Sequence, residues 1–367
     1  MRFDPDRHFE MCMNLLNNSI FSSKPPALSL DHIHAVVQEH YGLTIAAEIV
    51  LLGSERDQNA IVRVNGKKLL VRVTNRAEAV DVTHLQTCAL IHVQRSAPGF
   101  PIQHLVPTLD GRTSIVLNDA LGGNVLRLMT YLDGTPMSSI KHRTRTHREN
   151  TGAALGKLAV TLNKFTHPFA SHDLIWNVVK ASQARELLAK IEDPRRRGLA
   201  THFLGQFERY ASNHLPLLRS QVIHNDLNPH NILFESDTST KVTGVLDFGD
   251  MIFNPIIVDV AVAASSHMTS TTSPLEGPGE VIRGFNAELA LRECELELLF
   301  DLMAARLVLN ATITGWRALL YPAMRDYILK NNNISWDTLA AFESVDRQQA
   351  SDYFKSICTG AKAHRDS

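Results

Sequence analysis

The stretch VIHNDLNPHNILF (222–234), followed by VTGVLDFGD (242–250), combines apolar, strand-like runs with three spaced polar side chains. Asp226 and Asn231 lie five residues apart, and Asp247 follows sixteen residues later. Carboxylate and amide oxygens are the ligands that Mg²⁺ prefers, and a carboxylate that does not bind the metal can orient a hydroxyl group and accept its proton. These side chains are a sufficient set for phosphoryl transfer from a nucleotide, which depends on positioning and charge neutralisation.

Turn formation is the competing interpretation of Asp226 and Asn231, because Asp and Asn are common turn residues. For either residue alone, a turn would be the better explanation. Their occurrence together with His224, Pro229 and the spaced Asp247 favours a functional loop. The apolar residues that flank them predict buried strands that hold this loop rigidly, namely Val222, Ile223, Ile232, Leu233, Val245 and Leu246.

Regular apolar spacing predicts helices on both sides of a strand-rich segment near the N-terminus. Ser29 and Asp31 are both suitable caps for one helix, and Pro98-Gly99 stops another. Asn65-Gly66 is a strong hairpin signal between short runs of Val, Ile and Leu, which predict an antiparallel sheet. The helices are expected within 8–18, 29–42 and 76–96, and the strands within 46–53, 59–65, 67–75, 113–123 and 124–134.

From about residue 146 the pattern is mainly helical, with a β-hairpin set into it. The segment 265–280 is rich in Ser, Thr, Pro and Gly, which predicts a loop or lid. Strands are expected at 220–227, 231–236 and 241–250, and helices at 149–165, 177–193, 197–215, 289–330 and 336–357.

Composition bounds the class of protein. The 367 residues are too many for one compact core and suit two unequal lobes. The net charge is −1 and the dense basic runs, 141–148 and 194–197, are short, so no nucleic-acid partner is expected. The first residues are charged, and the apolar stretches are far shorter than the roughly 20 residues that cross a bilayer. A cytoplasmic protein without a membrane partner is therefore expected.

The cysteines are Cys12, Cys88, Cys294 and Cys358, far apart and without a CxxC pair. This spacing predicts neither a disulfide framework nor a zinc site, and it fits a reducing compartment.

The motifs HNDLNPHN (224–231) and LDFGD (246–250) together resemble the aminoglycoside phosphotransferase and choline kinase superfamily, a relative of the protein kinases. The resemblance implies a two-lobed α+β fold, with a small antiparallel sheet and one helix in the N-terminal lobe and a larger, mainly helical C-terminal lobe. The expected bounds are 1–128 for the nucleotide-binding lobe with its helical extension, 129–134 for the linker, and 135–367 for the catalytic and acceptor-binding lobe.

By the same resemblance, Asp226 is the catalytic base, Asn231 is a Mg²⁺ ligand and Asp247 is the principal Mg²⁺ ligand. His224 resembles the histidine that braces the catalytic loop. Asp259, in PIIVDVAVAA, resembles the helix aspartate that caps the backbone of this loop, and for both residues a structural role is favoured over direct chemistry. The implied co-substrate is ATP or GTP, with Mg²⁺.

The nucleotide-binding matches are weaker. GSERDQNAIVRV (53–64) resembles the hairpin turn that covers the nucleotide phosphates, where backbone N–H groups and the Ser54 hydroxyl would act. The strand that follows aligns with the one that normally carries a phosphate-gripping lysine, but Arg72 stands at that position. The planar fork of Arg is not equivalent to a compact ammonium group. Glu78 and Asp81 are the candidates for its acidic partner.

The segment RLMTYLDGTPM (127–137) resembles the linker between the lobes. In this reading Met129, Tyr131 and Leu132 would meet the nucleotide base through their backbone groups. A run of Leu and Met is equally what a buried strand needs, and both interpretations stay open.

The motifs as a set look most like the hydroxylysine kinase branch. This resemblance implies a small hydroxylated amine as acceptor, either an amino alcohol or a hydroxy-amino acid. Aminoglycosides, homoserine, choline and ethanolamine are alternative acceptors, and Arg72 leaves open a nucleotide-binding pseudokinase that acts as a regulator.

The acceptor's charges indicate which side chains could bind it. An amine calls for acidic or aromatic groups, and a carboxylate calls for a base such as Arg306. The candidates for the amine are Trp176, Asp250, Glu297, Asp301, Trp316 and Tyr321. Side chains in such positions more often belong to a core or a helix surface than to a ligand site.

Overall fold

The computed structural model describes residues 23–46, 48–54, 56–117 and 123–359. The chain forms two compact units: unit 1 comprises residues 1–133 and 167–172, and unit 2 comprises residues 134–166 and 173–367. The helix expected within 8–18 lies outside the described residues. In the part of the chain that the structure describes, no helix has the length and apolar character needed to span a bilayer.

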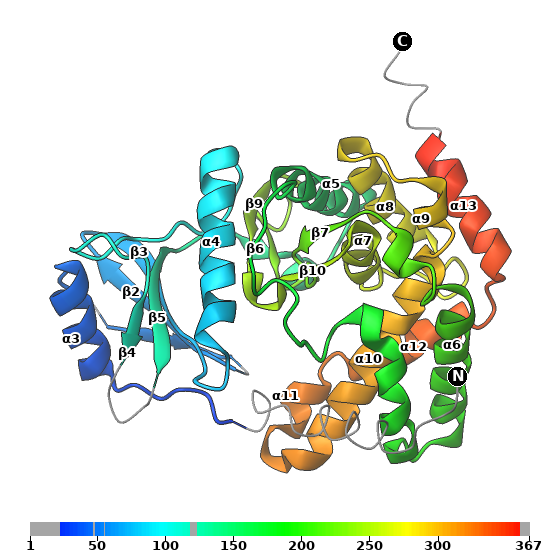
Figure 1. Ribbon diagram of the computed structural model, residues 1–367, viewed down its shortest axis with the longest axis horizontal. Coiled ribbons are helices and arrows are strands. Elements are labelled where there is room, and N and C mark those ends of the chain that lie inside the picture. The colour runs from blue at the N-terminus through cyan, green and yellow to red at the C-terminus, as the bar shows by residue number, and fades with distance from the viewer. Residues whose placement is uncertain (1–22, 47, 55, 118–122, 360–367) are drawn as a thin grey trace, which may run out of the picture. The chain divides into compact units, whose positions relative to one another are not determined.

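A five-stranded antiparallel sheet forms the centre of unit 1 (Figure 1). Asn65 and Gly66 join its second and third strands with φ angles of 49° and 77°. Asn-Gly favours this left-handed turn, so the expected hairpin is confirmed. In spatial order the strands are β1 (Val50–Leu52), β2 (Gln58–Val64), β3 (Lys67–Val73), β5 (Asn124–Thr130) and β4 (Ile115–Leu117).

Two helices of unit 1, α3 (Leu30–Tyr41) and α4 (Val80–Ser96), lie on opposite sides of this sheet in Figure 1. Of the two candidate caps, Ser29 begins α3, because its hydroxyl accepts a hydrogen bond from the N–H of His32 at 3.2 Å. Gly42 ends this helix with a φ of 65°. The core shared by α3 and the sheet includes Ile33, Val37, Tyr41, Val62, Val71, Leu126 and Leu128.

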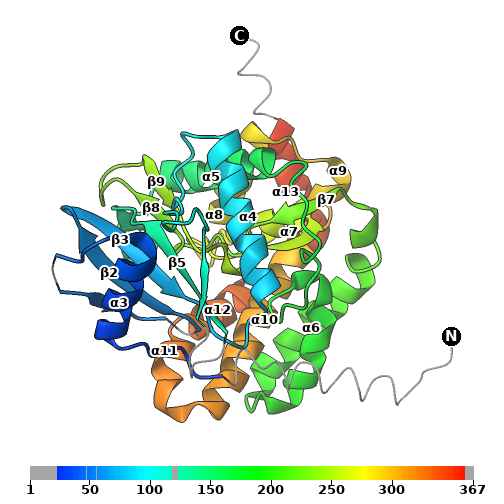
Figure 2. The same ribbon diagram turned by 60° about the vertical axis from the view of Figure 1, so that its left-hand side comes forward.

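Unit 2 is mainly helical, which confirms the expected fold class. Its α-helices are α5 (Arg145–Thr161), α6 (Pro194–Tyr210), α7 (Ile256–Ala264), α8 (Glu276–Glu288), α9 (Glu293–Leu296), α10 (Leu299–Leu320), α11 (Arg325–Leu329), α12 (Asn332–Phe342) and α13 (Arg347–Thr359). The long α10 packs against α6, α7 and α12 (Figure 2). The helix expected within 177–193 is a 3₁₀ segment, η2 (Val178–Lys190), and the one expected at 336–357 is split between α12 and α13.

The segment 265–280 is only partly the loop that its composition predicted, because α8 begins at Glu276. Its Pro278 is tolerated in the first helical turn, where an N–H group has no partner within the helix. The glycines of α5 and α8 serve close packing: a Cβ added to Gly284 would lie 1.9 Å from the carbonyl oxygen of Glu149. A Cβ added to Gly152 would similarly lie 1.9 Å from a backbone oxygen of α8.

Two small antiparallel sheets surround the HNDLNPHN motif. β7 (Ser220–Ile223) pairs with β10 (Ile252–Pro255) and not with the strand that follows it in sequence. β8 (Ile232–Phe234) instead pairs with β9 (Val242–Val245) and with β6 (Thr135–Pro136). The loop 224–231 therefore leaves one sheet and enters the other, which fixes both of its ends.

Candidate active site

Asp259 of α7 anchors the start of the loop 224–231. Its two carboxylate oxygens accept hydrogen bonds from the backbone N–H groups of His224 (3.0 Å) and Asn225 (2.7 Å). Asn225 has a φ of 64°, a left-handed conformation that Asn adopts more readily than most residues. Burial raises the pKa of Asp259, whereas His224 and the hydrogen bonds from the two N–H groups lower it. The contacts are those expected of a side chain that holds loop backbone.

His224 connects this loop to the segment that carries Asp247. Its ring is fully buried, with Nε2 donating to the carbonyl oxygen of Leu246 at 2.9 Å and Nδ1 accepting from the N–H of Asp226 at 3.2 Å. These two bonds together require the neutral tautomer that carries its proton on Nε2. The edge of the ring also meets Phe248, at 5.0 Å between ring centroids. These contacts correspond to the bracing role that the sequence suggested.

Asp226 receives hydrogen bonds on both carboxylate oxygens. Arg306 donates from Nη2 to Oδ1 at 2.9 Å, and the Nδ2 groups of Asn228 and Asn231 donate to Oδ2 at 3.1 and 2.9 Å. Burial, together with the negative charges of Asp250 and Asp247, raises the pKa of Asp226 to about 7, against the positive charge of Arg306. One-fifth of the side chain remains exposed, so a hydroxyl group from solvent can reach it. The carboxyl group is thus poised to exchange a proton near neutral pH.

Asn231 and Asp247 offer the oxygens that a divalent cation would need. The Nδ2 group of Asn231 bonds to both the backbone oxygen (2.8 Å) and the side chain of Asp226, which leaves its Oδ1 as the atom suited to a cation. Asp247 adopts a left-handed conformation, with φ 58° and ψ 78°, and its Oδ1 accepts from the N–H of Gly249 at 3.2 Å. Left-handed non-glycine residues cluster at functional sites.

This set of oxygens fits Mg²⁺. Asp247 and Asp250 lie near enough to Asp226 for their charges to raise its pKa, so the site concentrates negative charge. A bound divalent cation would neutralise part of this negative charge. Asn231 and Asp247 are the residues that would hold it.

Arg306 and Trp176 are two of the sequence's candidates for acceptor binding; Arg306 contacts Asp226, and Trp176 contacts Arg306. Arg306 belongs to α10 and is 7% exposed, and its Nη1 donates to the backbone oxygen of Trp176 at 3.3 Å. Its guanidinium carbon also lies 5.6 Å from the centroid of the Trp176 ring. Asp250, the third candidate, is buried at the end of the short 3₁₀ turn η4 (Phe248–Asp250).

The other acidic candidates for an acceptor amine are engaged in ion pairs. Asp301 is fully buried and accepts from Nε of Arg347 at 2.7 Å, and burial raises its pKa to about 6 against the Arg347 charge. Glu297 accepts from Lys355 at 2.8 Å. Both carboxylates therefore form ion pairs with residues of α13.

In unit 1, Arg72 pairs with an acid that the sequence interpretation overlooked. Its Nε donates to Oδ2 of Asp57 at 2.7 Å, and Oδ1 of Asp57 accepts from the N–H of Asn75 at 3.1 Å. The expected partner Glu78 binds Thr83 and Gln86 instead. Gln86 also accepts a hydrogen bond from the buried Arg127 at 3.0 Å. The turn residue Asp57 is thus an acidic partner of Arg72 that the candidates Glu78 and Asp81 did not include.

The remaining nucleotide candidates occupy the turn before β2 and the end of β5. The hydroxyl of Ser54 accepts from the N–H of Asp57 at 3.2 Å and so shapes its turn. Met129 is buried within β5, as a strand interpretation predicts. Tyr131 and Leu132 follow this strand, and the Tyr131 ring lies 5.2 Å from Nζ of Lys68.

Asn228 is a site residue that the sequence analysis missed. Besides its bond to Asp226, its Oδ1 accepts from the N–H of His230 at 2.8 Å, which holds the loop around the carboxylate. Its position two residues after Asp226 was the available signal, because Asn at that spacing bonds readily to nearby groups.

Comparison with known proteins identifies a family. The model of the phosphotransferase enzyme family matches residues 48–294. Hydroxylysine kinase of Xenopus laevis is 26% identical over 353 residues, which cover 89% of this chain and 93% of that protein.

Solved structures share the fold at lower identity. An amicoumacin kinase in complex with AMP-PNP and Ca²⁺ superimposes with a TM-score of 0.62 at 13% identity, over 88% of this chain and 97% of that one. A microcompartment-associated aminopropanol kinase gives 0.55 at 16% identity, over 91% and 97%. These two likenesses concern the protein-kinase-like fold alone.

Proposed function

The chain belongs to the phosphotransferase enzyme family and is a phosphotransferase that acts on the hydroxyl group of a small molecule, and from this premise we propose that its acceptor is a hydroxy-amino acid of the hydroxylysine type. The γ-phosphate of ATP or GTP is the group transferred. The observation that carries the proposal is the buried guanidinium of Arg306 beside the carboxylate of Asp226.

Arg306 supports an acceptor that carries a carboxylate. A guanidinium group has five N–H donors and can bind a carboxylate with two parallel hydrogen bonds, so Arg306 can bind an acceptor carboxylate while it stays bonded to Asp226. Its bond to Asp226 places an acceptor carboxylate bound there close to the proposed base. The Trp176 ring lies against the same guanidinium and limits the directions from which a ligand can approach.

The chain's own residues supply the remaining roles. Asp226 would orient the acceptor hydroxyl and take its proton as the oxygen forms a bond to the γ-phosphorus and the bond to the β-phosphate oxygen breaks. Its pKa of about 7 suits a base that works near neutral pH. Asn231 and Asp247 would hold Mg²⁺, which when bound neutralises charge on the phosphates. Arg72 in unit 1 is proposed to contact the phosphates, and Ser54, Met129, Tyr131 and Leu132 to meet other parts of the nucleotide.

A matched pair of acceptors tests this proposal. Hydroxylysine and its decarboxylated analogue share the hydroxyl and both amines, so only the carboxylate differs. We expect kcat/KM to be higher for hydroxylysine than for the analogue. Arg306→Gln should lower the ratio of the two kcat/KM values at least about tenfold. The preference ratio is the decisive readout, because the contact of Arg306 with Asp226 can also lower the absolute rate.

The same assay with other acceptors can contradict the proposal. Homoserine, ethanolamine, choline, aminopropanol and kanamycin serve as competing acceptors, each with ATP and with GTP. Faster turnover of an acceptor that lacks a carboxylate would overturn the proposal. An unchanged preference in Arg306→Gln would remove Arg306 from it.

A further inference from the structure

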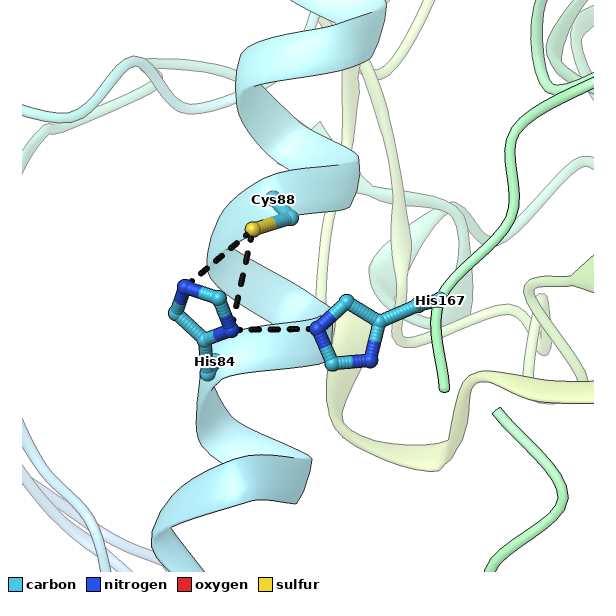
Figure 3. Close-up of side chains that lie close together, drawn as sticks. All are labelled: His84, Cys88 and His167. Carbon is cyan, nitrogen blue, oxygen red and sulfur yellow. Dashed lines mark hydrogen bonds between the residues drawn. The ribbon is translucent and has the colours of Figure 1, made fainter. Parts of the chain in front are cut away.

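Three side chains that can ligate a metal meet on unit 1, in a place that the proposed reaction does not use (Figure 3). His84 and Cys88 project from one face of α4, because residues four apart on a helix are neighbours. His167 approaches them from the segment 167–172. One ligand atom from each residue lies within 4.8 Å of the other two.

The distances are close to those of a tetrahedral metal site. Nδ1 of His84 lies 3.0 Å from Nε2 of His167 and 3.9 Å from Sγ of Cys88. Zinc bonds of about 2.0–2.1 Å to nitrogen and about 2.3 Å to sulfur put neighbouring ligand atoms about 3.3–3.6 Å apart. Shifts of a few tenths of an ångström in the exposed or half-buried side chains would bring these two distances to those values, and the ligand atoms of Cys88 and His167 lie within 4.8 Å of each other.

The backbone that carries the ligands is well supported. Leu85 and Ala89, which adjoin His84 and Cys88 in sequence, are fully buried, so α4 cannot turn its ligand face away without disrupting the core. On His167, Nδ1 accepts a hydrogen bond from the N–H of Phe169 at 3.3 Å, which directs Nε2 toward His84. Metal binding at Nε2 would move the ring proton to Nδ1 and give up this long, weak bond.

The charge state of the cluster also suits a cation. Burial and the nearby His84 lower the pKa of His167, which favours the neutral imidazole, the form that can bind a metal. Asp81, one turn before His84 on α4, acts on His167 with a negative charge. Burial raises the pKa of the Cys88 thiol, so a metal must displace its proton.

We propose that His84, Cys88 and His167 bind one divalent transition-metal ion of the Zn²⁺ class, with solvent at the fourth position. A thiolate and two imidazoles select such an ion over Mg²⁺, which prefers oxygen ligands. On binding, the Cys88 thiol releases its proton to solvent as the metal–sulfur bond forms. The ion fastens the segment 167–172 to α4. The cysteine spacing gave no sign of this site because two of its three ligands are histidines.

Co²⁺ titration of the chelator-stripped, full-length protein tests the site. We expect one equivalent to produce a near-ultraviolet thiolate-to-cobalt band and visible bands of tetrahedral Co²⁺, all removed by stoichiometric Zn²⁺ and unaffected by excess Mg²⁺. Cys88→Ser should abolish the thiolate band, and His84→Gln and His167→Gln should each weaken Co²⁺ binding at least about tenfold. Cys294→Ser and His172→Gln are the matched controls, because Cys294 is exposed on α9 and His172 lies in the same segment as His167. Neither should change the titration.

Two results would overturn the proposal: no thiolate band at stoichiometric Co²⁺, or a band that survives in Cys88→Ser. Thermal unfolding of each metal-free variant reports whether it is folded. If Cys88→Ser does not fold, loss of the band in the histidine variants decides the question, and its persistence there refutes the site. No acceptor or nucleotide is present, so this outcome is independent of the proposed kinase reaction.

Discussion

Two opposing groups of contacts set the charge of Asp226. Burial and the carboxylates of Asp247 and Asp250 raise its pKa, whereas the guanidinium of Arg306 and the amide of Asn228 lower it. Removing any one of these groups would therefore shift the pKa of Asp226. The pH dependence of turnover therefore reports directly on these contacts.

The first prediction concerns this pH dependence. Because the base must be ionised and its pKa is about 7, kcat/KM should rise with pH through that value and level off above it. Asn228→Ala removes a hydrogen bond that lowers the pKa of Asp226, so the rising limb should move to higher pH. Added Mg²⁺ favours the ionised carboxylate and should move the limb to lower pH.

Steady-state rates between pH 5 and pH 9 measure these shifts. Asp226→Asn is the control, because it keeps the size of the side chain and removes the base, and its residual turnover should be orders of magnitude lower and without this limb. A flat profile between pH 6 and pH 8 in the wild type, or an acid shift in Asn228→Ala, would contradict the proposed base.

At the scale of elements, turns and helix ends could be predicted from local sequence patterns, whereas the pairing of separate strands could not. The β2–β3 hairpin and the cap of α3 were predictable because Asn65-Gly66 and Ser29 act on the backbone within a few residues of their own positions. The partner of β7 was not, since all the short strands near it are similarly apolar and several pairings satisfy the same pattern. Gly277 contributed to the prediction of a loop at 265–280, but it lies within α8. It allows close packing there, because a Cβ at this position would lie 1.9 Å from the carbonyl oxygen of His267.

The second prediction concerns the crossing of α5 and α8. Gly284→Ala would place a Cβ against the backbone oxygen of Glu149, so the helices must move apart, which should cost about 1–3 kcal/mol or more of unfolding free energy. Gly198→Ala in α6 is the matched control, since a Cβ there meets no atom within 4 Å. That change should be neutral or stabilise by up to about 1 kcal/mol, because Ala is the better helix former.

Denaturant unfolding of both variants measures the difference. Equal stability of Gly284→Ala and the wild type would show that α5 and α8 can separate without loss. The prediction would then be wrong about the close contact.

At the scale of the whole molecule, the fold class followed from the sequence, whereas the site followed only in part. Asp226, Asn231 and Asp247 were accessible because their spacing lies within one short stretch. The ion pair of Arg72 with Asp57 was not, because a turn explained Asp57 equally well. The meeting of His84 with His167 joins segments 83 residues apart, and no local pattern carries it.

The last prediction separates the two proposed metal sites by their effect on stability. A ligand that binds only the folded protein stabilises it by RT ln(1 + [L]/Kd), about 2.7 kcal/mol at one hundred times Kd. ATP with Mg²⁺ should therefore raise the midpoint of thermal unfolding more than ATP with EDTA does. Asp247→Asn should remove most of the Mg²⁺-dependent part, because it removes a charge while Asn tolerates the left-handed backbone and keeps an oxygen for the N–H of Gly249. His84→Gln should leave the Mg²⁺-dependent shift intact, since Mg²⁺ does not favour imidazole or thiolate ligands. An undiminished shift in Asp247→Asn, or its loss in His84→Gln, would mean that Mg²⁺ is not held where the loop 224–231 and Asp247 predict.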